Sequence, residues 1–145
     1  MIATEVIPNL WIGGIKSALD LDFLKTTKIT VIINCTIKYP FPKYKAIQIR
    51  VPVSDRGNDY DIDRMYEFLN TIVPNIYQLL QKGHRILIHC YAGCHRSVCV
   101  VLAFLMKYGQ MTLQQSIDSL QSKWPRVGLN FSRSLCRYAL HDLKI

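Results

Sequence analysis

The sequence predicts an α/β fold: a single domain over residues 1–145, with a central, mostly parallel, twisted sheet flanked by helices. The chain has 145 residues and half of them are hydrophobic, which is enough for one domain with a sizeable core. Short apolar runs typical of buried strands alternate with longer segments that begin at helix-capping residues. Because this alternation favours parallel strand pairing, helices are expected on both faces of the sheet.

The expected strands are short segments in which apolar residues run together or alternate. They cover residues 5–12, 29–34, 46–53 and 85–89. The last of these contains Ile86-Leu87-Ile88 and is expected at the centre of the sheet. An apolar segment over residues 98–106 follows it, long enough for a buried helix.

The other expected helices are marked by residues that favour helix ends. Their predicted N-caps and ends are Ser17 to about Lys25, Asp61 to about Lys82, and Thr112 to about Lys123. Gly83 suits the position after the second helix, and Gln115 completes a capping box with Thr112. Pro74 lies inside the second helix and is expected to kink or break it. A final helix is expected from about Asn130 to the end.

The stretch between the central strand and the apolar helix carries the candidate chemistry. It reads His89-Cys90-Tyr91-Ala92-Gly93-Cys94-His95-Arg96-Ser97. Such a short arc before a helix folds into a cup of inward-facing N–H groups, which binds a tetrahedral oxyanion. Arg96 closes the cup by forking onto two phosphate oxygens. The same N–H groups favour a thiolate at Cys90, which is then placed to attack phosphorus.

These nine residues resemble the signature of the cysteine-dependent protein tyrosine phosphatases. The Arg96-Ser97 pair, followed by the apolar segment ending in Leu102-Ala103-Phe104-Leu105-Met106, resembles the small, atypical dual-specificity branch. The resemblance extends over nearly the whole chain, through residues 7–13, 29–36 and 51–55. It implies that residues 91–96, which are Tyr91, Ala92, Gly93, Cys94, His95 and Arg96, bind the substrate phosphate, with no metal and no cofactor.

The resemblance also implies the roles of the remaining site residues. It places the general acid at Asp55, the Asp that ends the strand, with Asp59 as the alternative because the following loop is slightly long. Ser97 is expected to hydrogen-bond the sulfur and help it leave the phosphocysteine. His89 is expected to support the loop structurally. Asn130 is a candidate for the same support, although Leu129 replaces the Pro that usually precedes it.

The five cysteines raise the question of redox control. None lies in a paired metal-binding spacing. A low-pKa thiolate is easily oxidised, and a nearby cysteine protects it by forming a disulfide. Cys35 ends a strand expected to face the same crevice as Cys90, as in some relatives of the superfamily. Cys94 is the competing partner, and the plain alternative is that Cys35 is a small buried hydrophobe.

Three functions are compatible with these residues. The first is a protein phosphatase for phosphotyrosine and phosphoserine/threonine, acting on phosphorylated proteins. The second is an RNA 5′-phosphatase or phosphoinositide phosphatase, favoured by the net charge of +8 and opposed by Arg96-Ser97 where RNA-directed relatives tend to have Arg-Thr-Gly. The third is a non-catalytic phosphate-binding module, against which the presence of Cys90, Arg96 and Asp55 argues.

The surroundings of the protein are predicted from what the sequence lacks. No apolar run reaches the length of a membrane span, and no signal peptide is visible. We therefore expect a cytoplasmic or nuclear protein in a reducing compartment. Without a long N-terminal helix of the kind that mediates dimers in some relatives, we expect a monomer.

Overall fold

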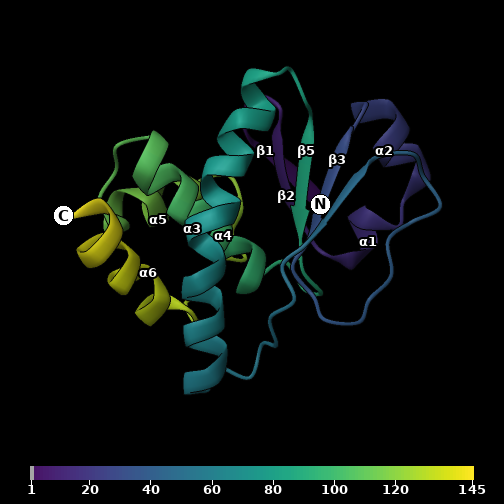
Figure 1. Ribbon diagram of the computed structural model, residues 1–145. Coiled ribbons are helices and arrows are strands. Elements are labelled where there is room, and N and C mark those ends of the chain that lie inside the picture. The colour runs from purple at the N-terminus through teal and green to yellow at the C-terminus, as the bar shows by residue number, and fades with distance from the viewer. Residues whose placement is uncertain (1) are drawn as a thin grey trace.

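A computed structural model describes residues 2–145 and has one five-stranded sheet with helices on both faces (Figure 1). Met1, the first residue of the predicted domain, lies outside the described residues. The strands are β1 (Ala3–Ile7), β2 (Leu10–Gly13), β3 (Val31–Asn34), β4 (Ile47–Arg50) and β5 (Ile86–His89). Their order is β1-β2-β5-β3-β4; β1 is antiparallel to β2, and the other pairs are parallel. The predicted fold class and the central position of β5 are confirmed.

Alternating side chains along the strands divide the core into two parts. In β5, Ile86 and Ile88 face one side of the sheet and Leu87 the other, as the two-residue period of a strand requires. The first side packs against α3 (Asp59–Gln81), α4 (Arg96–Tyr108), α5 (Leu113–Gln121) and α6 (Ser132–Tyr138). The second side is covered by α1 (Ile15–Ala18) and α2 (Leu21–Thr27), at the right of Figure 1.

The N-terminal segment differs from the prediction of one strand over residues 5–12. It forms a hairpin in which β1 and β2 are separated by Pro8-Asn9. Asn9 adopts φ 72°, and its N–H donates to the Glu5 carboxylate at 2.8 Å. A left-handed Asn is one of the residues that reverses a chain, so the apolar pattern on either side belongs to two strands.

Two predicted N-caps were also wrong. The Ser17 hydroxyl donates back to the Gly14 carbonyl, and Asp20 caps α2 by accepting from the Phe23 N–H. Likewise Asn58, and not Asp61, caps α3. The predicted capping box of Thr112 at the start of α5 is confirmed.

Helix α4 begins directly after the loop formed by residues 90–95, the candidate phosphate loop, and α3 packs against α4. Helix α3 continues through Pro74 without a break, and Gly83 follows its C-cap with φ 85°. Helix α4 is buried along residues 96–106, so its N-terminus is fixed directly after the loop.

The last helix begins at Ser132, two residues later than expected, and continues as a π-helical turn, η1 (Ala139–Leu143). Within residues 2–145, no helix is both long and apolar enough to cross a membrane.

Candidate active site

The candidate nucleophile lies where β5 ends and the loop to α4 begins. Cys90 is 2% exposed, and its Sγ is 3.2 Å from the Oγ of Ser97 in the first turn of α4. When the sulfur is ionised it can only accept, so Ser97 then donates this hydrogen bond. The carboxyl end of a central parallel strand, followed by a helix N-terminus, is where α/β sheets bind anions.

Arg96 is held at the other end of the loop by backbone. Its Nη1 donates to the Val53 carbonyl at 3.0 Å, two residues before Asp55. Its Nε is buried without a hydrogen-bond partner among residues 2–145. Since buried polar groups are nearly always satisfied, this donor is available to a bound anion such as a phosphate oxygen.

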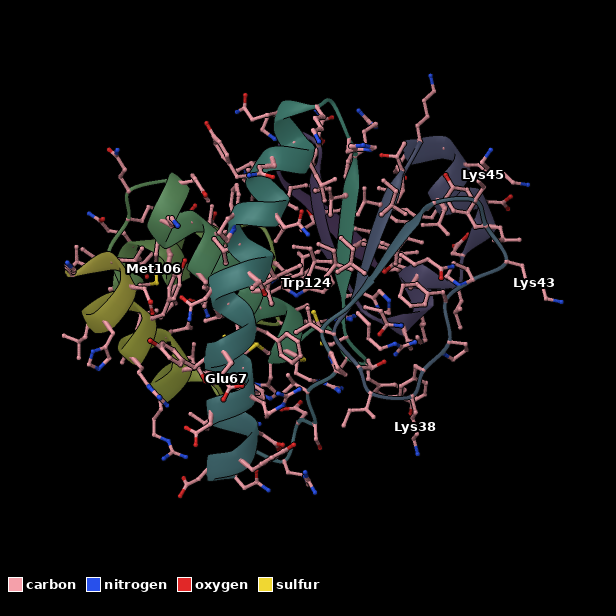
Figure 2. The ribbon with its side chains drawn as sticks, in the orientation of Figure 1. Lys38, Lys43, Lys45, Glu67, Met106 and Trp124 are labelled. Carbon is pink, nitrogen blue, oxygen red and sulfur yellow. The ribbon has the colours of Figure 1, made fainter. Side chains whose placement is uncertain are left out.

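The middle of the phosphate loop is shaped by a close contact with the segment after α5. Gly93 adopts φ 73°, and a β-carbon there would lie 2.9 Å from the Trp124 ring and 3.1 Å from the Gly13 carbonyl. The Trp124 Nε1–H donates to the Gly93 carbonyl at 2.7 Å. Figure 2 shows Trp124 in the interior between the helices and the sheet. Only glycine fits this position, which explains the Gly in the middle of the motif.

The two candidate general acids occupy different surroundings. Asp55 is half-buried, and its Oδ1 accepts from the Asn130 Nδ2–H at 3.2 Å. Asp59 is highly exposed and forms an ion pair with Arg133 at 3.0 Å. Asp55 therefore contacts Asn130, whose backbone N–H also reaches the phosphate loop at His95, whereas Asp59 is paired with Arg133 on the surface. The connection between β4 and α3, residues 51–58, is the candidate acid loop, and it is anchored by Asp61, which is buried and accepts from the Arg56 N–H.

His89 is fully buried behind the nucleophile. Its Nδ1–H donates to the Cys90 carbonyl at 3.2 Å, while Nε2 has no partner among the described residues. Burial, opposed by this hydrogen bond, lowers the pKa of His89 to about 4, with Arg50 and Arg96 adding to the shift. The ring is therefore neutral at physiological pH, as a structural support requires.

Cys35 lies beside Cys90 on the neighbouring strand end. Asn34 pairs with His89 in the β3–β5 register, and the Cys35 N–H donates to the His89 carbonyl at 2.8 Å. Burial, and then the nearby Cys90, raise the pKa of the Cys35 thiol. Cys94 is more accessible, and its Sγ lies 3.7 Å from the Ala92 carbonyl within the loop.

A wall beside the phosphate loop was not anticipated from the sequence. The Tyr39 ring stacks on Tyr91 with centroids 5.1 Å apart, and a slot of about 210 Å³ next to it is lined by Thr36, Ile37, Lys38, Tyr39, Ser54 and Arg96. Arg50 fixes this wall by donating to the carbonyls of Thr36, Ile37 and Tyr39. The only hint in the sequence was a charged residue, Arg50, inside the mostly apolar 46–53 segment.

A larger cavity lies on the other side of Tyr91. It measures about 390 Å³ and is lined by Ile2, Gly14, Ile15, Lys16, Tyr91, Ala92 and Arg126. Neither Cys90 nor Arg96 touches it. Cys90 does not line the smaller slot either, but Arg96 does, so the slot borders the Arg96 end of the phosphate loop.

The chain belongs to the dual specificity phosphatase family. The family model described as "Dual specificity phosphatase, catalytic domain" matches residues 10–140, which include the whole phosphate loop. Among related proteins, the "MAP kinase phosphatase with leucine-rich repeats protein 3" of Dictyostelium discoideum is 34% identical over 94% of this chain. The "Dual specificity protein phosphatase 12" of Rattus norvegicus is 32% identical over 88%. The chain spans only 16% and 38% of the lengths of these two relatives.

Solved structures agree with the fold. The crystal structure of human DUSP28 superposes with a TM-score of 0.86 at 23% identity, covering 95% of this chain and 93% of that one. The crystal structure of DUSP15 gives a TM-score of 0.83 at 25% identity, covering 96% and 88%. A human "tyrosine phosphatase-like serine/threonine/tyrosine-interacting protein" also superposes, at 0.83 and 24% identity. At 25% identity or less, these structures show the fold of the chain, and its chemistry depends on the residues of the phosphate loop.

Proposed function

We propose that this chain is a protein phosphatase that hydrolyses phosphotyrosine and phosphoserine/threonine monoesters through a phosphocysteine at Cys90. The observation that carries the proposal is the juxtaposition of Cys90, Ser97 and an Arg96 whose Nε is buried without a partner. A thiolate, a hydroxyl donor and an open guanidinium donor at one helix N-terminus match a tetrahedral phosphate in charge and in hydrogen bonding.

The reaction takes place in two displacements. In the first, the Cys90 sulfur bonds to phosphorus as the P–O bond to the substrate breaks, and protonated Asp55 gives its proton to the leaving oxygen. In the second, water attacks the phosphocysteine, Asp55 takes a proton from that water, and the S–P bond breaks to release phosphate and thiolate. Ser97 stabilises the departing sulfur by donating to it.

The direct test is the Cys90→Ser variant. It removes the nucleophile with a change of one atom, so turnover of a phosphopeptide should disappear while phosphate binding and thermal stability persist. Cys99→Ser is a matched control, because Cys99 is also buried but lies on α4 away from the loop start. Full activity of Cys90→Ser would refute the proposal.

The assignment of the general acid is tested separately. General acid catalysis contributes roughly 10²- to 10⁴-fold when the leaving group is poor. Asp55→Asn should therefore slow hydrolysis of phenyl phosphate far more than that of p-nitrophenyl phosphate, whose leaving group needs no proton. Asp59→Asn is the control. If Asp59→Asn shows the selective loss and Asp55→Asn does not, the roles are reversed.

The proposal extends to redox protection by Cys35. Peroxide converts the Cys90 thiolate to a sulfenic acid, and the Cys35 thiol displaces water from it to give a disulfide. Support comes from the adjacent positions of the two residues on neighbouring parallel strands, a spacing that suits a disulfide. Peptide mapping after peroxide distinguishes a Cys35–Cys90 bridge from one to Cys94. Equal recovery of activity by thiol in Cys35→Ser and wild type would remove Cys35 from this role.

Nucleic acid as the substrate is less well supported. Phe131 follows Asn130 near Arg126 and Arg133, where an aromatic ring could contact a base, but it is 1% exposed, so its ring is not free to stack. Arg133 is paired with Asp59. Comparing hydrolysis of a triphosphate-ended RNA, a phosphoinositide and a phosphopeptide tests this alternative, and a preference for either of the first two would overturn our assignment.

A further inference from the structure

The segment between α5 and α6 is hydrogen-bonded to three successive residues of the phosphate loop. We call residues 124–130 the latch segment. Its donors and acceptors are Trp124 Nε1 to Gly93 O (2.7 Å), Gly128 N to Cys94 O (2.8 Å) and Asn130 N to His95 Nδ1 (3.4 Å). On its other side the loop is held by the start of α1, where the Ile15 N–H donates to the Tyr91 carbonyl at 2.8 Å.

The last residue of the latch segment also reaches the acid loop. The Nδ2–H of Asn130 donates to Asp55 Oδ1 at 3.2 Å. Asn130 therefore contacts the phosphate loop through its backbone and the acid loop through its side chain. Asp55 is otherwise carried by a connection between β4 and α3 that has no regular secondary structure.

The latch segment approaches the phosphate loop so closely that no side chain fits between them at Gly128. A β-carbon at this position would overlap the His95 ring and would lie 3.1 Å from the Cys94 carbonyl oxygen. The φ angle of Gly128 is not in the left-handed region, so this glycine is required by the close approach and not by backbone conformation.

We propose that Asn130 is a positioning residue for the general acid, and that the latch segment holds Asp55 and the phosphate loop in one geometry. This inference rests on the proposed role of Asp55. Acceptance from Asn130 occupies Oδ1, which leaves Oδ2 as the oxygen that carries the transferable proton. The contact therefore orients the acid relative to the phosphate loop.

The test uses two variants of Asn130 and a matched control. Asn130→Ala removes the side-chain donor but keeps the backbone bond to His95. Because the lost hydrogen bond goes to the carboxylate that supplies the proton, we expect kcat for phenyl phosphate to fall roughly 10-fold or more, with less than about 3-fold loss for p-nitrophenyl phosphate. Asn70→Ala removes an exposed amide from α3 and should change neither rate.

The pH profile supplies a readout that a general loss of structure would not move. Asn130→Asp places a second carboxylate against Asp55, which then keeps its proton to higher pH. The alkaline limb of the pH profile of kcat for phenyl phosphate should therefore move to higher pH.

Gly128→Ala is an independent test, because it displaces the latch segment while the side chains of Asn130 and Asp55 remain. It should reproduce the selective loss for the poor leaving group.

The outcomes separate this inference from the proposed function. If Asp55→Asn itself shows no dependence on the leaving group, the acid assignment fails. If Asp55→Asn shows it but Asn130→Ala slows both substrates equally, or Asn130→Asp leaves the alkaline limb in place, the acid assignment stands and the inference about Asn130 is refuted. Thermal melting and inorganic phosphate binding of each variant confirm that the fold and the cup are intact.

Discussion

Protonation of His89 is expected to destabilise the protein as the pH falls below neutral. The ring is fully buried, and burial lowers its pKa from 6.5 to about 4. In the unfolded chain the ring binds a proton near pH 6.5, whereas in the folded chain it does so only near pH 4. The unfolded state thus binds more protons between these values, so stability present above pH 6.5 is lost progressively as the pH falls toward 4.

The size of the effect follows from the shift. Each pKa unit corresponds to about 1.36 kcal/mol, so the free energy of unfolding should fall by about 2 kcal/mol between about pH 8 and about pH 5, and by about 3 kcal/mol at about pH 4. Urea unfolding at each pH measures it. Wild type should lose about 2 kcal/mol more than His89→Gln, while exposed His141 serves as the control in His141→Gln.

Two results would refute this reasoning. One is an equal pH dependence of stability in wild type and His89→Gln. The other does not require the variant to fold: an NMR titration of the wild-type imidazole in which His89 protonates near pH 6.5 would show that burial does not hold the ring neutral. Either result would mean that a neutral, buried His89 is not what supports the phosphate loop, even though its hydrogen bond to the Cys90 carbonyl is present.

Three further perturbations test other parts of the structure. Ser97→Ala removes the hydroxyl 3.2 Å from Cys90 Sγ and should slow breakdown of the phosphocysteine roughly 10- to 100-fold. Stopped-flow kinetics should then show a burst of product before a slow steady state. A slowed burst phase with an unchanged steady-state rate would contradict this role of Ser97. Gly93→Ala forces a β-carbon against Trp124 at positive φ and should cost about 1–3 kcal/mol in chemical unfolding. Leu69→Ala empties a fully buried site on α3 and should cost about 2–5 kcal/mol while sparing KM.

The sequence predicted those parts of the site that are local in the chain. Strand β5, the loop and α4 are consecutive, so their apolar pattern and the motif between them were enough to place Cys90, Arg96 and Ser97 together. Asp55 was predicted from its position at the end of a strand segment, and the structure places it beside the latch segment. The hairpin at Asn9 was missed because an apolar pattern does not record a single left-handed residue.

The unpredicted parts depend on contacts between distant segments. Trp124 meets Gly93 across 31 residues, and Arg50 meets Thr36 and Tyr39 across a loop of irregular structure. Neither contact follows from periodicity, since each is set by how the connections pack after the sheet has formed. The predicted N-cap of α3 was wrong for a related reason. The Asp61 carboxylate is buried and accepts from Arg56, so Asn58 caps the helix instead.

The proposed nucleophile differs from the other buried cysteines in its surroundings. Cys35, Cys90 and Cys99 all lie in the same core, each 2% exposed or less. Burial raises the pKa of both Cys35 and Cys99, which keeps these two as thiols. Cys90 differs in its position at the start of the phosphate loop, with the Ser97 hydroxyl at 3.2 Å and the N-terminus of α4 beyond it. Burial and residue type are common to all three cysteines, so the proposed choice of Cys90 rests on the Ser97 hydroxyl and the helix N-terminus aimed at its sulfur.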